Sequence, residues 1–439
     1  MLKQALQSTS WVLVDKVATM GLNLLATLVI ARTLGPEQFG VLAYLLALVT
    51  LIGPLAALGF NAIVTREVVE QPQREVSIMS TVCSFRLLGA VVGNGLLLGW
   101  AWLFGELSPA QFGLLCLMAG GYTLNAFRVF EFYFQAKMAI KYVAIVRTTI
   151  ALVFTAAKVT VALTSGEIFW VGSVYAMEFF VLGLGFIALY RWYSGSAFFR
   201  QINWRYGLSL LRQSSWLVLS SVASIIYLKV DQIMLANMVD NQAVGIYAVA
   251  ARLSEVWYFI AEAIVISFFP MLLQLKSADA AHYQQRLQQL CDSLFVLALT
   301  LALVVTVIAG PVVTLLFGEA YAASATVLSI HIWAGVFVFM RALASKWIIA
   351  HGLMKYSLLS HGLGAIINIV VNLIAIPRWG ALGAAWATVV SYATASYLVF
   401  WLAPATRPIA GFMSRSLLLP LTLGYRYWHA AGAPLRTPS

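Results

Sequence analysis

Long apolar stretches alternate with short polar links along the whole chain. A membrane-spanning helix needs about 20 mostly apolar residues, and by that measure the sequence predicts about twelve spans. They cover residues 8–32, 39–65, 84–104, 109–131, 142–164, 168–190, 208–237, 243–272, 290–317, 324–350, 357–377 and 381–402. Several exceed the length that a bilayer of about 30 Å requires, so we expect tilted helices. The pattern predicts an all-α polytopic membrane protein whose first apolar run is a retained helix.

Composition supports this class and excludes others. Of the 439 residues, 62% are hydrophobic and 10% are charged, whereas a soluble domain is about 45–50% apolar and about 25% charged. The net charge of +11 is spread between apolar runs, which indicates topology signals rather than a nucleic-acid partner. The three cysteines and five histidines show no metal-ligand or disulfide spacing. We expect no metal and no cofactor.

The basic residues predict the orientation. The longer links, around residues 67–75, 136–141, 191–205 and 276–289, are rich in lysine and arginine, whereas the short links hold little beyond Arg32 and Arg378. By the positive-inside rule the longer links face the cytoplasm, and an even number of helices places both termini there. Residues 404–439 contain five prolines and four arginines. We expect a basic tail on the inner membrane face, with disorder as the alternative.

Charged residues interrupt the apolar pattern between residues 227 and 270. Two neighbouring segments carry five of them: Lys229, Asp231, Arg252, Glu255 and Glu262. A Lys, Arg or Asp at the centre of a spanning helix costs roughly 2.5–3.5 kcal/mol on insertion scales. Such groups are tolerated when they face one another or a water-filled cavity. The pattern therefore favours a polar path through the membrane.

The chain shows signs of internal duplication. Gly40 in Gln-Phe-Gly-Val-Leu matches Gly245 in Ala-Val-Gly-Ile-Tyr with an offset of 245 − 40 = 205, and Trp11 matches Trp216 with the same offset. Arg128 matches Arg341 with an offset of 341 − 128 = 213. The unit is about six helices, and an even number gives both copies the same orientation. This is the parallel-repeat arrangement of transporters with a site between two bundles.

Three motifs resemble one known family. Residues 32–44, Arg-Thr-Leu-Gly-Pro-Glu-Gln-Phe-Gly-Val-Leu-Ala-Tyr, resemble the opening of Wzx-type polysaccharide flippases of the multidrug/oligosaccharidyl-lipid/polysaccharide (MOP) exporter superfamily. Residues 229–235 followed by 244–247 resemble the start of their second half, and residues 377–385 their eleventh-to-twelfth helix turn. The resemblance implies a MATE-like fold with two six-helix bundles, residues 1–200 and 201–403, before the tail. It also implies helices 1, 2, 7 and 8 around a central cavity.

The resemblance further implies a function. Its cargo is an undecaprenyl-diphosphate-linked oligosaccharide, moved across the bacterial inner membrane for O-antigen, lipopolysaccharide, capsule or exopolysaccharide synthesis. Membrane lipids, a polysaccharide polymerase and a chain-length regulator are the implied partners. The physics agrees, because diphosphate and sugars need a wet, preferably cationic route. Candidate cavity and substrate-binding residues are Lys16, Asn23, Asn61, Lys229, Tyr247, Arg252 and Trp257, and candidate coupling or charge-network residues, for H⁺ or Na⁺, are Asp15, Asp231, Glu255 and Glu262.

Each candidate has a structural alternative. Arg252 and Glu255 are three residues apart and share a helix face, so they are equally compatible with a neutralising pair. Lys229 and Asp231 are also compatible with a tie from helix 7 to helix 1 or 8. Asp15 and Lys16 are close enough to the cytoplasmic start to lie at the interface. Arg128 and Arg341 lie near helix ends where long side chains snorkel, and Tyr247 and Trp257 fit packing or anchoring as well as sugar contact.

Three rival functions share features with this prediction. A cation-coupled multidrug antiporter of the same superfamily has the same fold, but the many intramembrane cations favour an anionic cargo. A lipid II flippase normally adds a further helix pair to the twelve that we count. An enzyme such as a polymerase or ligase needs a catalytic outer loop, and the outer links span only a few residues. We therefore expect a transporter, not an enzyme.

Overall fold

The computed structural model describes residues 2–195, 199 and 201–422, and its regular elements in that part of the chain are helices. The first half contains α1 (Leu2–Leu51), α2 (Gly53–Ala57), α3 (Phe60–Glu70), α4 (Glu75–Phe104), α5 (Pro109–Thr123), η2 (Leu124–Arg128), α6 (Val129–Ala136), α7 (Ile140–Ser165) and α8 (Ile168–Ser194). The second half contains α9 (Trp204–Met238), α10 (Asn241–Glu255), α11 (Tyr258–Ala278), α12 (Ala280–Phe317), α13 (Ala322–His331), α14 (Ala334–Ala350), α15 (Lys355–Trp379), α16 (Ala381–Ala393), η4 (Thr394–Leu398), α17 (Val399–Leu402) and α18 (Arg407–Leu417). Short 3-10 turns, η1 (Pro72–Arg74) and η3 (Glu319–Tyr321), precede α4 and α13.

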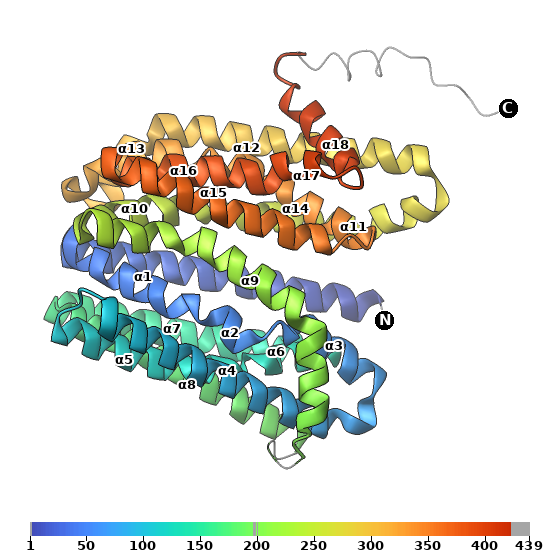
Figure 1. Ribbon diagram of the computed structural model, residues 1–439, viewed down its shortest axis with the longest axis horizontal. Coiled ribbons are helices and arrows are strands. Elements are labelled where there is room, and N and C mark those ends of the chain that lie inside the picture. Colours follow the sequence, from blue (N-terminus) through green and yellow to red (C-terminus); the bar gives the residue numbers. More distant parts are fainter. Residues whose placement is uncertain (1, 196–198, 200, 423–439) are drawn as a thin grey trace.

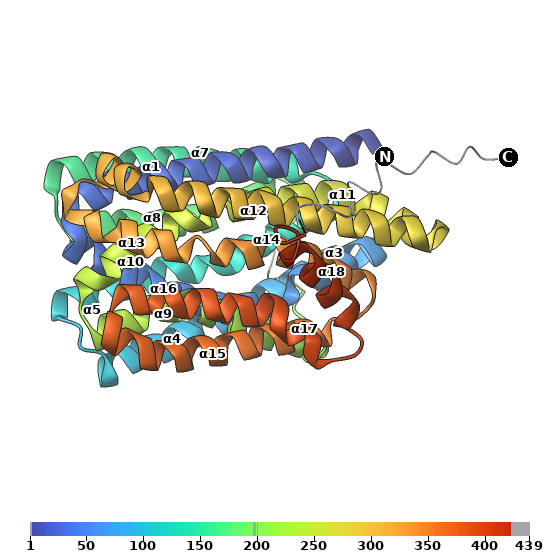
Figure 2. The ribbon, with the colours of Figure 1, turned by 90° about the horizontal axis from the view of Figure 1, so that it is seen from above.

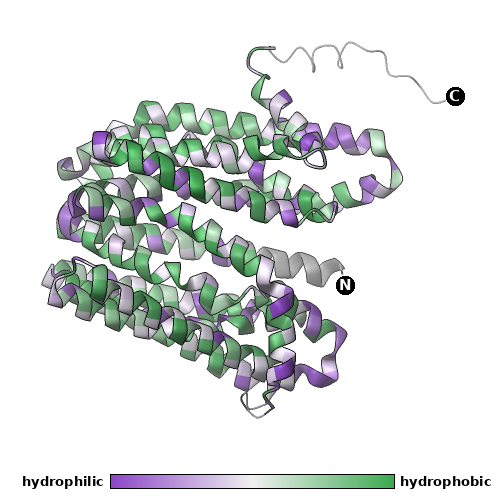
Figure 3. Ribbon diagram, in the orientation of Figure 1, coloured by the Kyte–Doolittle hydropathy of each residue, from purple (hydrophilic) through white to green (hydrophobic). Residues whose placement is uncertain are grey.

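The helices are long and apolar enough for a multi-span membrane protein. Ten candidate spans occur among the described residues, and α13 and α14, bent by 46°, together give an eleventh. The first candidate, Val14–Ala57, covers 44 residues, and Figure 1 shows the chain doubling back within α1. Figure 3 shows hydrophilic residues gathered near the α11–α12 link and around α3, with hydrophobic residues along the helices between the two ends. The predicted membrane class and all-helical fold are confirmed.

The reversal inside α1 occurs at Gly35. This residue has φ 73° and ψ 172°, and Pro36 follows it, so the helix ends and restarts there. A positive φ is accessible to glycine because it lacks a Cβ atom. The break divides α1 into two legs. The first covers the predicted segment 8–32. The second ends at Leu51, so the predicted segment 39–65 also includes α2 and the first part of α3.

Beyond the break, the second leg of α1 packs closely against α10. A Cβ atom placed on Gly40 would lie 1.7 Å from the carbonyl oxygen of Asn241. A Cβ atom on Gly245 would lie 2.0 Å from the carbonyl oxygen of Pro36. Gly40 and Gly245 are also the pair matched by the 205-residue offset, so the glycines permit backbone-to-backbone contact between two corresponding positions of the sequence repeat.

The helices of the two halves lie on opposite sides of the molecule, with α1 and α9 between them (Figures 1 and 2). One large cluster of buried apolar side chains includes α1, α10, α12, α13 and α14. A second joins α3, α4, α6 and α8 with the first part of α9. The boundaries predicted at residues 200 and 403 stay predictions.

The start of α9 is fastened to the first half. The Tyr206 hydroxyl donates to Glu67 Oε2 at 2.8 Å, and a Cβ atom on Gly207 would lie 2.1 Å from the Phe85 ring. Burial raises the pKa of Glu67, but hydrogen bonds from Arg66 and Tyr206 outweigh it and hold that pKa below its ordinary value. Later turns of α9 pack along α15, so this helix joins the two halves.

The segment predicted as a basic tail begins with an ordered helix. α18 packs on α12 and buries Ile409, Ala410 and Met413. The Ser416 hydroxyl donates to Asp292 Oδ1 at 2.6 Å, and Gln288 Nε2 donates to the Phe412 carbonyl at 3.1 Å. The rest of the predicted tail, residues 423–439, lies outside the described residues.

Candidate functional site

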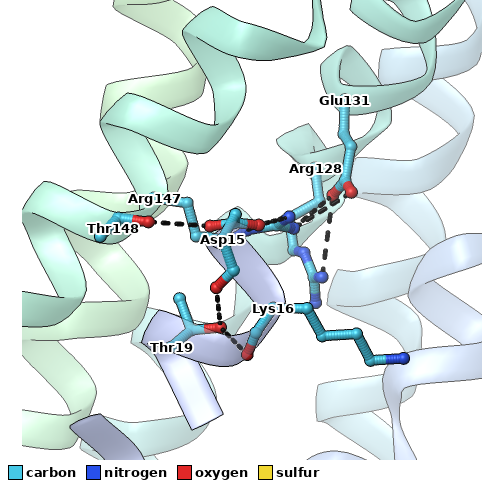
Figure 4. Close-up of polar contacts among 7 residues, drawn as sticks. All are labelled: Asp15, Lys16, Thr19, Arg128, Glu131, Arg147 and Thr148. Carbon is cyan, nitrogen blue, oxygen red and sulfur yellow. Dashed lines mark hydrogen bonds and ion pairs between the residues drawn. The ribbon is translucent and has the colours of Figure 1, made fainter. Parts of the chain in front are cut away.

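A network of charged side chains lies inside the first half, between α1, α6 and α7. Arg147 Nε donates to Asp15 Oδ2 at 2.8 Å, and Nη1 donates to both Glu131 oxygens at 3.0 Å. Thr148 Oγ1 donates to Asp15 Oδ1 at 3.0 Å, and Arg128 Nη2 lies 3.9 Å from Glu131 Oε2. Figure 4 shows Asp15 and Glu131 meeting at Arg147, with Thr148 joined to Asp15 and Arg128 joined to Glu131. Asp15 is only 1% exposed, so its charge depends on these partners.

The network lines a cavity of about 430 Å³. Asn23, Thr19, Lys16 and Glu178 complete its polar wall. Its ionisable lining balances, with three carboxylates (Asp15, Glu131, Glu178) against three cations (Lys16, Arg128, Arg147). A cavity with a charged and polar wall is an environment in which intramembrane charges are tolerated.

Glu178 is paired with a lysine behind this wall. Lys158 Nζ on α7 lies 2.6 Å from Glu178 Oε2 on α8 and 4.0 Å from the centroid of the Tyr175 ring. The Lys158 side chain is fully buried. The pair joins α7 to α8 and neutralises Glu178, so Lys158 acts from within the helix packing rather than from the cavity surface.

One ion pair links the two halves at this depth. Lys16 Nζ on α1 donates to Glu262 Oε2 on α11, with the side chains 40% and 55% exposed. Glu262 lines a second cavity of about 320 Å³ between α11 and α14, together with Tyr258, Arg341, Ser345 and Lys346. Lys16 lines the first cavity and Glu262 the second, so their ion pair lies between the two spaces.

A different polar cluster lies in the second half around Asp231. The Tyr247 hydroxyl donates to Asp231 Oδ2 at 2.7 Å and Thr388 Oγ1 donates to the same oxygen at 2.9 Å. Asn372 Nδ2 donates to Oδ1 at 2.5 Å and to the Asn368 side-chain oxygen at 3.1 Å. Asp231 is 2% exposed and has no ion-pair partner among the described residues. The cluster brings α9, α10, α15 and α16 together around one carboxylate with neutral donors.

The sequence comparisons place the chain among known families. A model of the polysaccharide biosynthesis protein family matches residues 5–276, more than half of the 439 residues. The chain belongs to the polysaccharide biosynthesis protein family. A model of the lipid II flippase MurJ family matches residues 185–423. A comparison with curated proteins found no match.

Solved structures share the fold of this family member across nearly its whole length. An inward-closed lipid II flippase MurJ aligns with a TM-score of 0.70 and 12% identity, covering 96% of this chain and 93% of that one. An inward-facing MATE multidrug resistance transporter of the MOP superfamily gives 0.67 and 14%, covering 90% and 96%. An outward-facing MATE transporter gives 0.64 and 11%, covering 93% and 96%. The predicted MATE-like fold is confirmed, and the two family models that match the sequence are those of a polysaccharide biosynthesis protein and of a lipid II flippase.

The structure brings some of the candidate residues together. Asp15, Lys16 and Asn23 line the first cavity, and Glu262 lines the second. Asp231 and Tyr247 meet through a buried hydrogen bond, which ties helix 7 to helix 8 as one of the alternatives expected. Their roles in transport stay predictions.

Other candidates lie apart from these sites. Asn61 accepts a hydrogen bond from Arg86 Nη1 at 2.8 Å within the first half. Arg252 is exposed and Lys229 and Glu255 are half-buried, and none of the three has an ion pair in the described part of the chain. The expected Arg252–Glu255 pair is therefore absent there, although both residues lie in α10. Trp257 lies at the turn before α11 and is 37% exposed.

Sequence reasoning missed Arg147, the partner of Asp15, and all the partners of Asp231 described above except Tyr247. Arg147 interrupts the apolar segment 142–164, which is the same signal that singled out the other intramembrane charges. Asn368 and Asn372 are four residues apart and share one face of α15, and Thr388 lies on the next helix. A polar face on an otherwise apolar span was the available signal for this second set.

Proposed function

We propose that this protein is a flippase for undecaprenyl-diphosphate-linked oligosaccharide repeat units. It moves them from the cytoplasmic to the periplasmic leaflet of the bacterial inner membrane, with its own termini in the cytoplasm, and supplies O-antigen, capsule or exopolysaccharide synthesis. The observation that carries the proposal is the pair of charged cavities on either side of the Lys16–Glu262 ion pair. Membership of the polysaccharide biosynthesis family supports the same cargo class.

The chemistry of the cargo fits such an arrangement. A polyprenyl tail can stay in the bilayer, while the diphosphate and sugars cannot cross hydrocarbon. A route lined by charged and polar groups replaces the water that these groups lose. Arginine and lysine donate strong charge-assisted hydrogen bonds to phosphate oxygens, and both residue types line the cavities.

Transport proceeds by alternating access of the two six-helix bundles. The Gly40–Gly245 contact lies at the end of the molecule with short links, and Lys16–Glu262 lies nearer the end with long links. Exchange of these two sets of contacts would open the site first to one side and then to the other. A polysaccharide polymerase and a chain-length regulator are the proposed downstream partners.

Asp231 is the proposed coupling residue. It is a buried carboxylate surrounded by hydroxyl and amide groups, and it has no counter-charge in the described part of the chain. Oxygen-rich clusters of this kind suit a proton or a hard cation such as Na⁺. Binding or release of this ion would then change the net charge at Asp231 and, with it, how tightly α9, α10, α15 and α16 pack.

A deletion strain tests the proposal directly. We expect lipid-linked repeat units to accumulate on the cytoplasmic leaflet and surface glycan to disappear, with both restored by the wild-type gene. Normal surface glycan together with altered drug tolerance would contradict the proposal and favour a multidrug antiporter.

The MurJ family match over residues 185–423 favours one further candidate, a lipid II flippase. The same gene expressed in cells depleted of their lipid II flippase distinguishes the two. Under our main proposal the gene does not restore growth of the depleted cells. Restored growth of those cells, together with normal surface glycan in the deletion strain, would favour lipid II as cargo.

A further inference from the structure

The two cavities differ in how their cations are compensated. In the first, Lys16, Arg128 and Arg147 each have a carboxylate within 4.0 Å. In the second, between α11 and α14, Arg341 and Lys346 have none among the described residues, and the one carboxylate in the wall, Glu262, is paired with Lys16. The second cavity therefore carries positive charge that no described side chain neutralises.

Arg341 is held in place by neutral groups. Nη1 donates to Ser360 Oγ and, at 2.8 Å, to the Ala395 carbonyl. Nε donates to Ser345 Oγ at 3.2 Å, and Nη2 lies 3.2 Å from His361 Nε2. The Ala395 carbonyl lies in the π-helical turn η4, where the usual helical hydrogen-bond pattern is interrupted.

These contacts use four of the five guanidinium N–H groups. They fix the orientation of the guanidinium without cancelling its charge. One N–H of Nη2 is left for a further acceptor. Snorkelling, the alternative expected for Arg341 from the sequence, does not apply, since the guanidinium bonds to groups on α14, α15 and η4 within the helix packing.

Lys346 adds a second cation to the same wall. It lies five residues after Arg341 on α14 and lines the cavity with Ser345. Its ammonium group lies 5.7 Å from the Phe269 ring centroid and forms no ion pair in the described part of the chain. The planar guanidinium of Arg341 and the ammonium of Lys346, on its flexible side chain, line the same cavity. Together they suit an anion with several oxygen atoms.

We propose that Arg341, Lys346 and Ser345 form a subsite for a phosphate or diphosphate group on the wall of the second half. This deepens the proposed function, on which it rests, by assigning the charged head of the lipid carrier to this cavity rather than to the first one. Free pyrophosphate has the same chemistry, so the test separates the two sources.

Binding to the purified full-length protein in nanodiscs tests the subsite. The probes are farnesyl diphosphate, inorganic pyrophosphate and, as an uncharged control, farnesol, each measured by tryptophan fluorescence titration. We expect Lys346→Gln to weaken binding of the diphosphate probes about tenfold or more, because it removes a charge-assisted contact. Farnesol binding should not change.

Two further variants sharpen the result. Lys355→Gln removes an exposed lysine outside this cavity and should leave all affinities unchanged. Glu262→Gln removes the carboxylate from the wall and should strengthen diphosphate binding about two- to fivefold. Tighter binding of farnesyl diphosphate than of pyrophosphate identifies the lipid headgroup as the ligand, and equal binding identifies the free anion; both support the subsite.

Equal losses in Lys346→Gln and Lys355→Gln, or no binding of either diphosphate by the wild type, would overturn the subsite. These outcomes are independent of the glycan assay. Unchanged binding by Lys346→Gln refutes the subsite even when the deletion strain accumulates lipid-linked glycan. Lost binding in that variant supports the subsite even when surface glycan is normal in the deletion strain.

Discussion

Asp15 and Asp231 are both buried carboxylates on the opening long helix of their half, yet their surroundings differ in kind. Asp15 is bonded to the Arg147 guanidinium, while Asp231 is bonded to two hydroxyls and an amide. Asp15 therefore has a full counter-charge in direct contact. Asp231 has neutral donors and no ion pair among the described residues, which is why we propose it, and not Asp15, as the site for a proton or a bound cation. The comparison separates a structural ion pair from a candidate coupling site.

Removal of Arg147 should have the largest effect. Arg147→Ala leaves Asp15 and Glu131 without their main cation, and breaking a buried pair from one side is destabilising by about 3–5 kcal/mol. Denaturant unfolding of the purified protein in detergent measures the change. The double variant Arg147→Met with Asp15→Asn should recover a large part of the loss; no recovery would show that Arg147 acts through packing rather than charge.

Neutralising Asp231 should have a smaller effect on stability. Asp231→Asn leaves no cation without its counter-charge. One of the groups that donate to Asp231 loses its acceptor, which lowers the unfolding free energy by about 1–3 kcal/mol. Its transport rate should lose any dependence on pH or Na⁺, measured by flipping of a fluorescent lipid-linked oligosaccharide in proteoliposomes. Asp15→Asn is the matched control, since it removes one of the two carboxylates bonded to Arg147 and should destabilise more. A larger loss of stability in Asp231→Asn would reverse the comparison between the two halves.

The ion pair between the halves should contribute least to folding. Both Lys16 and Glu262 are substantially exposed, and exposed pairs contribute about 0–1 kcal/mol. We expect Lys16→Gln to keep the unfolding free energy within about 1 kcal/mol but to lengthen the α1–α11 distance. Spin labels at Val17 and Ile266, both exposed, report that distance. An unchanged distance distribution would mean that the pair does not hold the halves together.

The smallest effect concerns Glu67, which ties α3 to the start of α9. Since its pKa is lowered in the folded protein, its contribution to stability is complete above the ordinary value of 4.5 and is lost as the pH falls through the lower folded value. The melting temperature of the wild type should therefore fall more steeply below about pH 4.5 than that of Glu67→Gln. Parallel melting curves would show that the tie does not depend on ionisation.

The spans were predictable from the sequence because each depends on a local property, the length of an apolar run. The charge pairs were not, because their members are distant in the chain. Asp15 and Arg147 are 132 residues apart, and Lys16 and Glu262 are 246 apart. The one pair that local spacing did favour, Arg252 with Glu255, is absent from the described ion pairs. Periodicity identifies a shared face of a helix but not the helix that packs against it.

The closeness of Gly40 and Gly245 has a mechanical consequence. Under the predicted parallel repeat, two equivalent positions that touch lie on the axis that relates the halves, so we expect the contact to be the pivot about which one bundle tilts against the other. A bulkier residue at either position would push α1 and α10 apart at the end of the molecule with the short links. We expect Gly245→Val to yield a leaky protein that passes small solutes in both directions, rather than merely a slow one.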